Sequence, residues 1–174
     1  FSENYEMAIE CNPAHLDFRH IDLLKKFGFN RISIGIQDFR KDVLDAINRR
    51  ESKHPLEDMV KKIADSGFTG TNIDLVYGLP LQTVDSFKST IERAINLGTD
   101  RIVTFSYAHV PSVLPRQKVL EDIGFPSPES KAKMYENSYD QLTQAGYVSI
   151  GMDHYSKPDD EFAIALSEKK LHRN

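Results

Sequence analysis

The sequence predicts an α/β protein built on a parallel sheet of repeated strand–helix units. Three observations predict this fold. A unit of helical pattern, glycine and apolar run occurs four times along the 174 residues. Each apolar run is short and rich in β-branched or aromatic residues, as in strands that are buried on both faces. Strands that alternate with helices along a chain are typical of parallel sheets.

Four glycines mark where the predicted helices end. Gly28, Gly67, Gly98 and Gly146 each follow a helical pattern and precede an apolar run. Glycine is favoured there because the residue after a helix commonly adopts a left-handed backbone conformation. We therefore expect strands near residues 8–11, 31–36, 73–77, 102–107 and 148–152, with a helix before each of the last four.

The helical segments carry start signals and apolar stripes. Apolar residues at 56, 59, 60 and 63 lie on one helical face behind Pro55, a residue suited to a first turn. Thr83 and the pair Ser127–Pro128 predict the starts of two further helices. A long connection occupies residues 110–127. This pattern does not separate a barrel from a doubly wound sheet, although neither a G-x-G-x-x-G nor a Walker A sequence occurs.

Length and composition fit one globular domain in a reducing compartment. The chain is 40% hydrophobic and 28% charged with a net charge of -4, which indicates neither a nucleic-acid nor a membrane surface. Its single cysteine, Cys11, excludes an internal disulfide and a multi-cysteine metal site. No apolar run approaches the roughly 18 residues of a membrane helix, so we expect a cytoplasmic protein. Because the chain opens on Phe1, we expect an internal piece of a longer protein.

Polar residues interrupt or end the predicted strands, where α/β proteins place their chemistry. Asp74 lies between Ile73 and Leu75, so strand alternation puts its carboxylate on the opposite face, which in a barrel is the lumen. Glu10 has the same setting. A buried carboxylate of this kind either pairs with a neighbouring cation or amide, or meets a ligand. The other polar residues at strand ends are Gln37, Asp38, His109, Asp153 and His154, and neither histidine has a partner at metal-ligand spacing.

Four segments together resemble one family. They are Arg31–Phe39, Asn72–Thr83, Tyr107–Pro111 and Gly151–Tyr155, the last continuing into Lys157–Glu161 and Leu171–Asn174. The first two are similar to strand motifs of several radical S-adenosylmethionine (SAM) enzymes. The segments from Gly151 onward resemble the oxygen-independent coproporphyrinogen III oxidases in particular. The resemblance covers essentially the whole chain. It implies that residues 1–174 are the later part of an incomplete TIM-like radical SAM barrel, with the start of the segment that follows.

The resemblance also implies a reaction and its cofactors. Family members hold a 4Fe-4S cluster on a C-x-x-x-C-x-C loop, bind two SAM molecules and form a 5′-deoxyadenosyl radical. This radical drives the oxidative decarboxylation of two propionates of coproporphyrinogen III to vinyl groups, giving protoporphyrinogen IX in haem biosynthesis. The cluster loop is absent here, because Cys11 is the one cysteine. We therefore expect this chain alone to bind no cluster and to be inactive.

Site residues follow from the resemblance by position. Glu10 resembles the family's acidic contact to the first SAM. The contacts to the second SAM are matched by Gln37, Arg49, Asp74 and Ala108, the last through its backbone. These residue types are suited to SAM. Carboxylates accept hydrogen bonds from ribose hydroxyls or an ammonium group, and arginine binds a carboxylate through two parallel hydrogen bonds. Asp153 and His154 are possible residues of the substrate side, and no catalytic residue or metal ligand is assigned.

Three alternatives remain open from the sequence. A related radical SAM protein that delivers haem shares the middle motifs but not the pattern from Gly151 onward. A binding fragment without activity, in which the carboxylates are structural, is a second alternative. An unrelated barrel lyase or aldolase is disfavoured, because no lysine stands out at a strand end. An incomplete barrel also exposes sheet edges, so self-association of the chain is expected.

Overall fold

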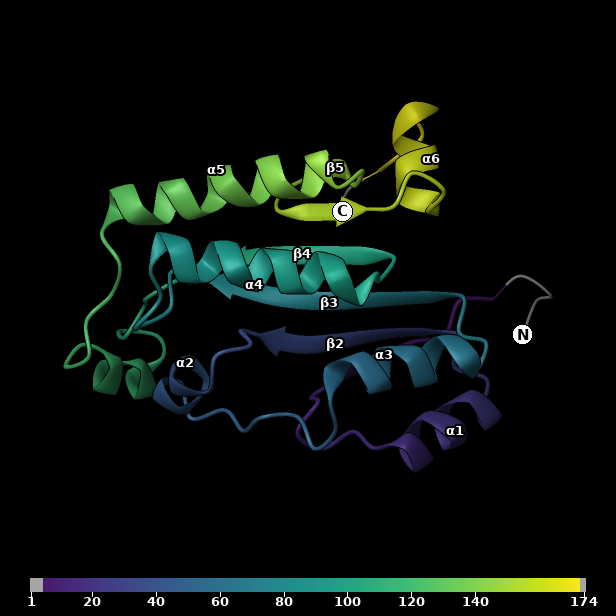
Figure 1. The fold of residues 1–174 in the computed structure, drawn as a ribbon, viewed down its shortest axis with the longest axis horizontal. Helices are drawn as coiled ribbons and strands as arrows, with labels where there is room; N and C mark the ends of the chain where they lie inside the picture. The colour runs from purple at the N-terminus through teal and green to yellow at the C-terminus, as the bar shows by residue number, and fades with distance from the viewer. Residues whose placement is uncertain (1–4, 173–174) are drawn as a thin grey trace.

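The computed structural model describes residues 5–172, and these form one six-stranded sheet with its main helices on one face (Figure 1). The strands lie in the order β1-β2-β3-β4-β6-β5, and the first four pair in parallel. The predicted α/β class is confirmed. The strand bounds are β1 Ala8–Cys11, β2 Arg31–Gln37, β3 Gly70–Tyr77, β4 Arg101–Ser106, β5 Val148–Gly151 and β6 His154–Ser156.

The helices begin and end largely where the sequence signals predict. Each of the four predicted helix-ending glycines has a positive φ, between 68° and 92°. Thr83 and Ser127 cap their helices by accepting hydrogen bonds from backbone N–H groups, whereas Pro55 precedes its helix instead of lying in the first turn. The helices are α1 Phe18–Lys26, α2 Lys41–Ala46, α3 Leu56–Asp65, α4 Val84–Leu97, α5 Pro128–Gln144 and α6 Glu161–Ser167, with a 3-10 helix at Pro115–Leu120.

The core lies between the sheet and the helices α1, α3, α4 and α5. Ile73 and Leu75 of β3 are fully buried on this face, and Asp74 between them points to the other face, as predicted. Helix residues Met59, Ile63, Phe87, Ile91 and Met134 pack against the strands. Within residues 5–172, none of the helices has the length and apolar character that crossing a membrane requires.

The sheet departs from the predicted all-parallel order at its last strands. We expected the run at 148–152 to extend the parallel sheet, but β6 lies between β5 and β4 and is antiparallel to both. The chain reverses at Met152 and Asp153, whose φ values are 48° and 67°. A two-residue hairpin turn of type I′ has positive φ at both central positions and usually shows Asn-Gly, Asp-Gly or Gly-Gly there. Met152–Asp153 carries no such signal, so the sequence did not reveal the hairpin.

A network of ion pairs ties the beginnings of β2 and β4 to α6. Asp160 accepts from Arg101 Nε at 2.9 Å, lies 3.5 Å from Arg31 Nη2, and caps α6 by accepting from the Phe162 N–H at 2.9 Å. Glu161 pairs with the same two arginines, at 2.7 and 3.2 Å. These contacts give the segment Lys157–Glu161 a structural role, at the end of the sheet opposite the strand carboxyl ends.

Both sheet edges are open in the part of the chain that the structure describes. β1 pairs with β2 alone and β5 pairs with β6 alone. Exposed strand edges favour pairing with another chain, so we expect the isolated 174-residue chain to form dimers or larger species as its concentration rises. Sedimentation velocity over a concentration series measures this, with Ala8→Lys, a charge on the β1 edge, expected to weaken it. A monomer at every concentration would contradict the expectation.

Candidate functional site

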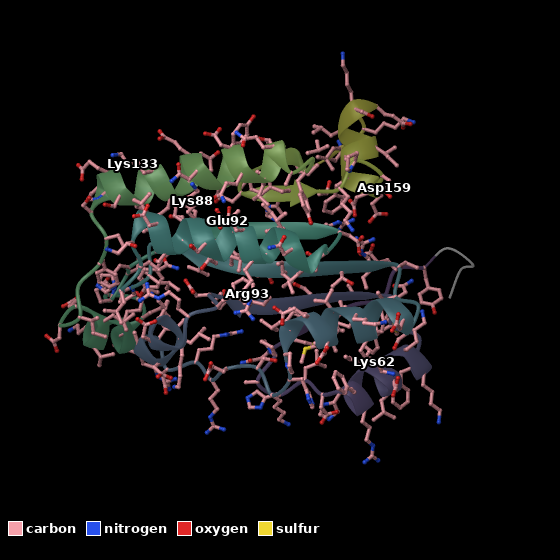
Figure 2. All side chains as sticks on the ribbon, viewed as in Figure 1. Lys62, Lys88, Glu92, Arg93, Lys133 and Asp159 are labelled. Carbon is pink, nitrogen blue, oxygen red and sulfur yellow. The ribbon has the colours of Figure 1, made fainter. Side chains whose placement is uncertain are left out.

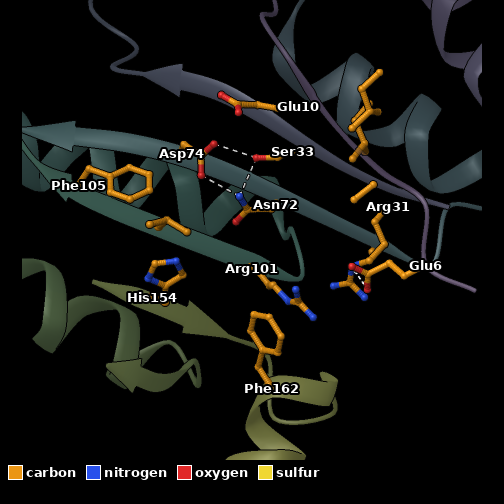
Figure 3. Close-up of a pocket in the computed structure, with 15 residues that line it drawn as sticks. Glu6, Glu10, Arg31, Ser33, Asn72, Asp74, Arg101, Phe105, His154 and Phe162 are labelled. Carbon is orange, nitrogen blue, oxygen red and sulfur yellow. Dashed lines mark hydrogen bonds and ion pairs between the residues drawn. The ribbon is translucent and has the colours of Figure 1, made fainter. Parts of the chain in front are cut away.

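A pocket of about 330 Å³ lies on the sheet face opposite the helices (Figure 3). Its polar side chains come from five strands that lie next to one another, because residues at alternate positions along each strand face this side. Glu10 comes from β1, Ser33 from β2, Asp74 from β3, Arg101 from β4 and His154 from β6. The remaining wall includes Asn72, Val103 and Phe105.

Asp74 is held at the centre of this pocket by two neutral side chains. Ser33 Oγ donates to Asp74 Oδ2 at 2.8 Å, and Asn72 Nδ2 donates to Asp74 Oδ1 at 2.8 Å (Figure 3). Asn72 also donates to Ser33 Oγ at 2.8 Å, which closes a three-membered network. Neither donor neutralises the carboxylate, and a carboxylate has about four acceptor positions. Asp74 therefore has capacity to accept further hydrogen bonds from a ligand.

Arg49 is a cation whose pKa is affected by the negative charge of Asp74. Its Nη2 donates to the carbonyl of Gly35, while its buried Nε has no hydrogen-bond partner among residues 5–172. Burial lowers the pKa of Arg49, and the negative charges of Glu10 and Asp74 oppose that shift. Arg49, Glu10 and Asp74 therefore act on one another electrostatically. The guanidinium also lines the second pocket, described next, where it can donate to an anionic ligand group.

A second pocket, of about 640 Å³, lies at the carboxyl ends of β2, β3 and β4. Its polar lining residues are Gln37, Asn48, Arg49, Tyr107, Arg116 and Gln117, the other lining residues are apolar, and within residues 5–172 no aspartate or glutamate lines it. Gln37 has a φ of 70° at a register shift in the β2–β3 pairing. Such a bulge redirects a side chain at the end of a strand. The pocket is suited to a ligand with an apolar body and a negative group.

Asp38 follows Gln37 but has a different role. It is 1% exposed and accepts from Gln82 Nε2 at 2.7 Å, and Gln82 Oε1 accepts from the Leu79 N–H at 2.9 Å. The two motifs 31–39 and 72–83 are thus joined by a buried hydrogen bond. This contact braces the turn after β3 and leaves Asp38 with no surface for a ligand.

Ala108 lies just past β4 and is fixed by the connection that follows. Gln117 Nε2 donates to the Ala108 carbonyl at 2.9 Å, and Gln117 Oε1 accepts from the Val110 N–H at 2.6 Å. His109 between them pairs with Glu121 at 3.0 Å. Gln117 was missed in the sequence because a glutamine in an irregular connection has no pattern that distinguishes it.

The structure separates the neighbours Asp153 and His154. His154 lines the pocket that contains Asp74, whereas Asp153 does not. Burial raises the pKa of Asp153, and its charge contributes to the raised pKa values of Tyr77 and Tyr155. Asp153 is therefore close to the tyrosines, and its possible place on the substrate side stays a prediction.

The predicted site residues thus fall into two neighbouring groups. Glu10, Asp74 and His154 lie around the first pocket, while Gln37 and Arg49 line the second with Ala108 nearby. Sequence reasoning missed Ser33 and Asn72, although the alternation Ile32–Ser33–Ile34 is a signal for a polar residue on the open face. Among residues 5–172, no cluster of three or more histidine, cysteine, aspartate or glutamate side chains could hold a metal ion.

Comparison with known proteins identifies the family. The profile of the Radical SAM superfamily matches residues 1–94, more than half of the chain, and the chain belongs to this superfamily. All 174 residues align, at 42% identity, with the oxygen-independent coproporphyrinogen III oxidase of Escherichia coli K12, and 173 residues at 43% identity with that of Synechocystis. The alignments confirm the resemblance inferred from the motifs.

A solved structure gives the same result for the fold. The structure described as coproporphyrinogen III oxidase from Escherichia coli, a radical SAM enzyme, superposes with a TM-score of 0.92 at 43% identity over 97% of this chain. The match covers 39% of that protein, and the chain spans about 38% of the Escherichia coli relative. The open six-stranded sheet is therefore a part of the radical SAM fold.

Proposed function

We propose that this chain is part of an oxygen-independent coproporphyrinogen III oxidase, in which residues 1–174 form the later part of the barrel and the start of the following segment. The oxidase converts two propionates of coproporphyrinogen III to vinyl groups. Each conversion releases carbon dioxide, passes one hydrogen atom to the 5′-deoxyadenosyl radical and passes one electron to an electron acceptor. The observation that carries the proposal is the similarity to these oxidases over the whole chain, reported above. The single free cysteine, Cys11, supports a reducing, cytoplasmic location.

The residues of the two pockets are suited to SAM. Glu10 and Asp74 offer carboxylate oxygens to ribose hydroxyls or an ammonium group, and the Arg49 guanidinium, which lines the second pocket, offers donors to a carboxylate. Gln37 and the Ala108 backbone complete the set. Held by these residues, SAM would supply the radical chemistry that removes hydrogen from a propionate side chain. The residues of this chain bind and orient the reactants and exclude water.

The cluster does not fit this chain. A 4Fe-4S cluster takes several cysteine thiolates, and the sequence has only Cys11. Burial raises the pKa of the Cys11 thiol, which disfavours the thiolate that ligates iron. The cluster ligands of the proposed oxidase therefore belong to a segment outside these 174 residues, and the chain alone should bind no iron and turn over no substrate.

One experiment tests the proposed function. The longer protein that contains this chain is reconstituted anaerobically, its iron is counted, and coproporphyrinogen III is supplied with SAM and a reductant. We expect about four irons on the cluster and vinyl product, whereas the 174-residue chain purified in parallel gives neither. A cluster with haem binding and no decarboxylation would favour the haem-delivering relative. A protein without a cluster would contradict the radical mechanism.

Gly35 provides a substitution that disturbs the SAM residues with little effect on stability. A Cβ atom at residue 35 would lie 2.8 Å from Gln37 Nε2 and 2.9 Å from Arg49 Nη2. Both are ends of flexible side chains and can move aside, so Gly35→Ala should displace them while the sheet persists. We expect SAM affinity to fall roughly tenfold or more, the effect of losing about one charged hydrogen bond.

The control for this substitution is Gly124→Ala, where the added Cβ meets nothing within 4 Å. Because Gly124 has a φ of 84°, this control is expected to cost some stability and no SAM affinity. Equilibrium titration of the longer protein with SAM measures the effect on affinity, and thermal unfolding measures the effect on stability. Unchanged SAM affinity in Gly35→Ala would show that Gln37 and Arg49 do not contact SAM.

A further inference from the structure

His154 is held in one orientation at the wall of the Asp74 pocket. Its Nδ1 lies 2.7 Å from the carbonyl oxygen of Met152, two residues earlier in the β5–β6 turn. Its ring meets the ring of Phe105 edge to face, with centroids 6.0 Å apart. Figure 3 shows the ring projecting from β6 toward Phe105 and the Asp74 side of the pocket. The Met152 carbonyl and the Phe105 ring together fix the orientation of the imidazole.

The contact to Met152 determines which nitrogen carries the proton. A carbonyl oxygen only accepts hydrogen bonds, so Nδ1 must be the donor. In the neutral imidazole the other nitrogen, Nε2, is then an acceptor. Nε2 lies at the end of the ring far from the backbone, and the part of the chain that the structure describes offers it no hydrogen-bond partner.

The turn that supplies this carbonyl has an unusual backbone. Met152 and Asp153 both have positive φ although neither is glycine, and such residues persist only where surrounding contacts hold them. Two contacts do so here: the His154 bond to Met152, and the Thr104 N–H, which donates to the Asp153 carbonyl at 2.9 Å. The strained turn therefore positions both the ring and its free acceptor.

From this geometry we infer that His154 Nε2 accepts a hydrogen bond from a pyrrole N–H of the tetrapyrrole substrate. The inference rests on the proposed function. A neutral acceptor beside the ring of Phe105 matches an aromatic N–H donor, because the substrate ring contacts the phenyl group while its N–H reaches the nitrogen. While the imidazole is neutral, a deprotonated propionate is not the partner, since Nε2 and the carboxylate oxygens are both acceptors. His154 is thus a positioning residue that orients the macrocycle.

Two substitutions at residue 154 separate this role from a structural one. The amide nitrogen of His154→Asn occupies the place of Nδ1 and keeps the bond to Met152, but this variant has no polar atom at the position of Nε2. The longer His154→Gln places its amide near Nε2, where its oxygen can accept, and loses the bond to Met152. If His154 only braces the turn, asparagine is the better replacement; if it binds substrate, glutamine is.

The test measures binding without turnover in the longer, cluster-containing protein. Coproporphyrinogen III is equilibrated anaerobically with each variant in the absence of reductant, and the retained ligand is quantified by its fluorescence after oxidation. We expect His154→Asn to bind roughly tenfold more weakly, the effect of one hydrogen bond, and His154→Gln to stay within about threefold of wild type. SAM affinity and the thermal midpoint of His154→Asn should be unchanged.

Several results would overturn the inference. One is that His154→Gln binds coproporphyrinogen III more weakly than His154→Asn does, or that both bind it equally well. Another is that SAM affinity falls as much as substrate affinity. Nitrogen-15 spectra of the histidine-labelled protein give an independent measurement, because a proton on Nε2 in the neutral ring contradicts the tautomer argument whatever the ligand is. If wild type binds no coproporphyrinogen III while the Nδ1 proton is present, the proposed function fails and the tautomer assignment stands.

Discussion

Replacing Asp74 with asparagine should remove most of the SAM affinity of the cluster-containing protein and leave its fold intact. Asparagine keeps the shape of the side chain, and the Ser33 hydroxyl, which donates to Oδ2 at 2.8 Å, can rotate to accept instead. The negative charge is lost, together with its attraction to Arg49. A hydrogen bond to a charged group contributes about 1.5–3 kcal/mol, so the dissociation constant for SAM should rise roughly 10- to 100-fold.

The matched control is Asp58→Asn, the same chemical change on the exposed face of α3. It should leave SAM affinity unchanged and lower the unfolding midpoint only slightly, because Asp58 lies in the first turn of α3, where a negative charge stabilises the helix by about 0.3–1 kcal/mol. Calorimetric titration with SAM gives the affinities, and thermal unfolding shows whether the sheet persists. If Asp74→Asn bound SAM as tightly as Asp58→Asn, the carboxylate would be structural, and the binding-fragment alternative would gain support.

Among the substitutions proposed for this chain, Asp160→Ala should cause the largest fall in the free energy of unfolding. Its side chain is 6% exposed, lies between two arginines and caps α6. Without Asp160, Arg31 and Arg101 keep, among residues 5–172, only the exposed partners Glu6 and Glu161. Removing one partner of a buried ion pair costs about 3–5 kcal/mol in the free energy of unfolding, and these exposed partners put the expected loss at the lower end of that range. Asp160→Asn should lose about 1 kcal/mol less than alanine, because asparagine can still cap the helix.

Asp159 provides the neighbouring control for this prediction. It is exposed and has no ion-pair partner among residues 5–172, and Figure 2 shows it at the surface near α6. Asp159→Ala should change the unfolding free energy by less than about 0.5 kcal/mol. Urea unfolding of the three variants measures the differences. A loss for Asp160→Ala no larger than that for Asp159→Ala would mean that the arginine network does not stabilise the fold.

The repeated units were predictable because each carries its own local signals. The left-handed glycines and the caps at Thr83 and Ser127 depend on neighbours in the sequence, so a pattern a few residues long reveals them. The inward direction of Asp74 was predictable for the same reason, since alternation along a strand is local. The structure confirms these features.

The features that were missed depend on contacts between distant segments. Strand β6 forms because β4 and β5 both offer it pairing partners, and its turn at Met152–Asp153 lacks the usual residues. The bond between Asp38 and Gln82 joins residues 44 positions apart, so no short pattern indicates that Asp38 is structural. Ser33 donates to Asp74 from 41 positions away, because β2 and β3 lie side by side. Asn72, by contrast, lies two positions from Asp74 on the same strand face, a local relation that the pattern could have shown.

The central claim, that these residues are part of a protein that removes hydrogen from coproporphyrinogen III with a SAM-derived radical, is tested most directly by isotope transfer. Coproporphyrinogen III deuterated on its propionate side chains is incubated anaerobically with the cluster-containing protein, SAM and a reductant. The account predicts that 5′-deoxyadenosine acquires deuterium while vinyl product forms. If 5′-deoxyadenosine forms without deuterium and the propionates remain, the substrate is another molecule and the account is contradicted.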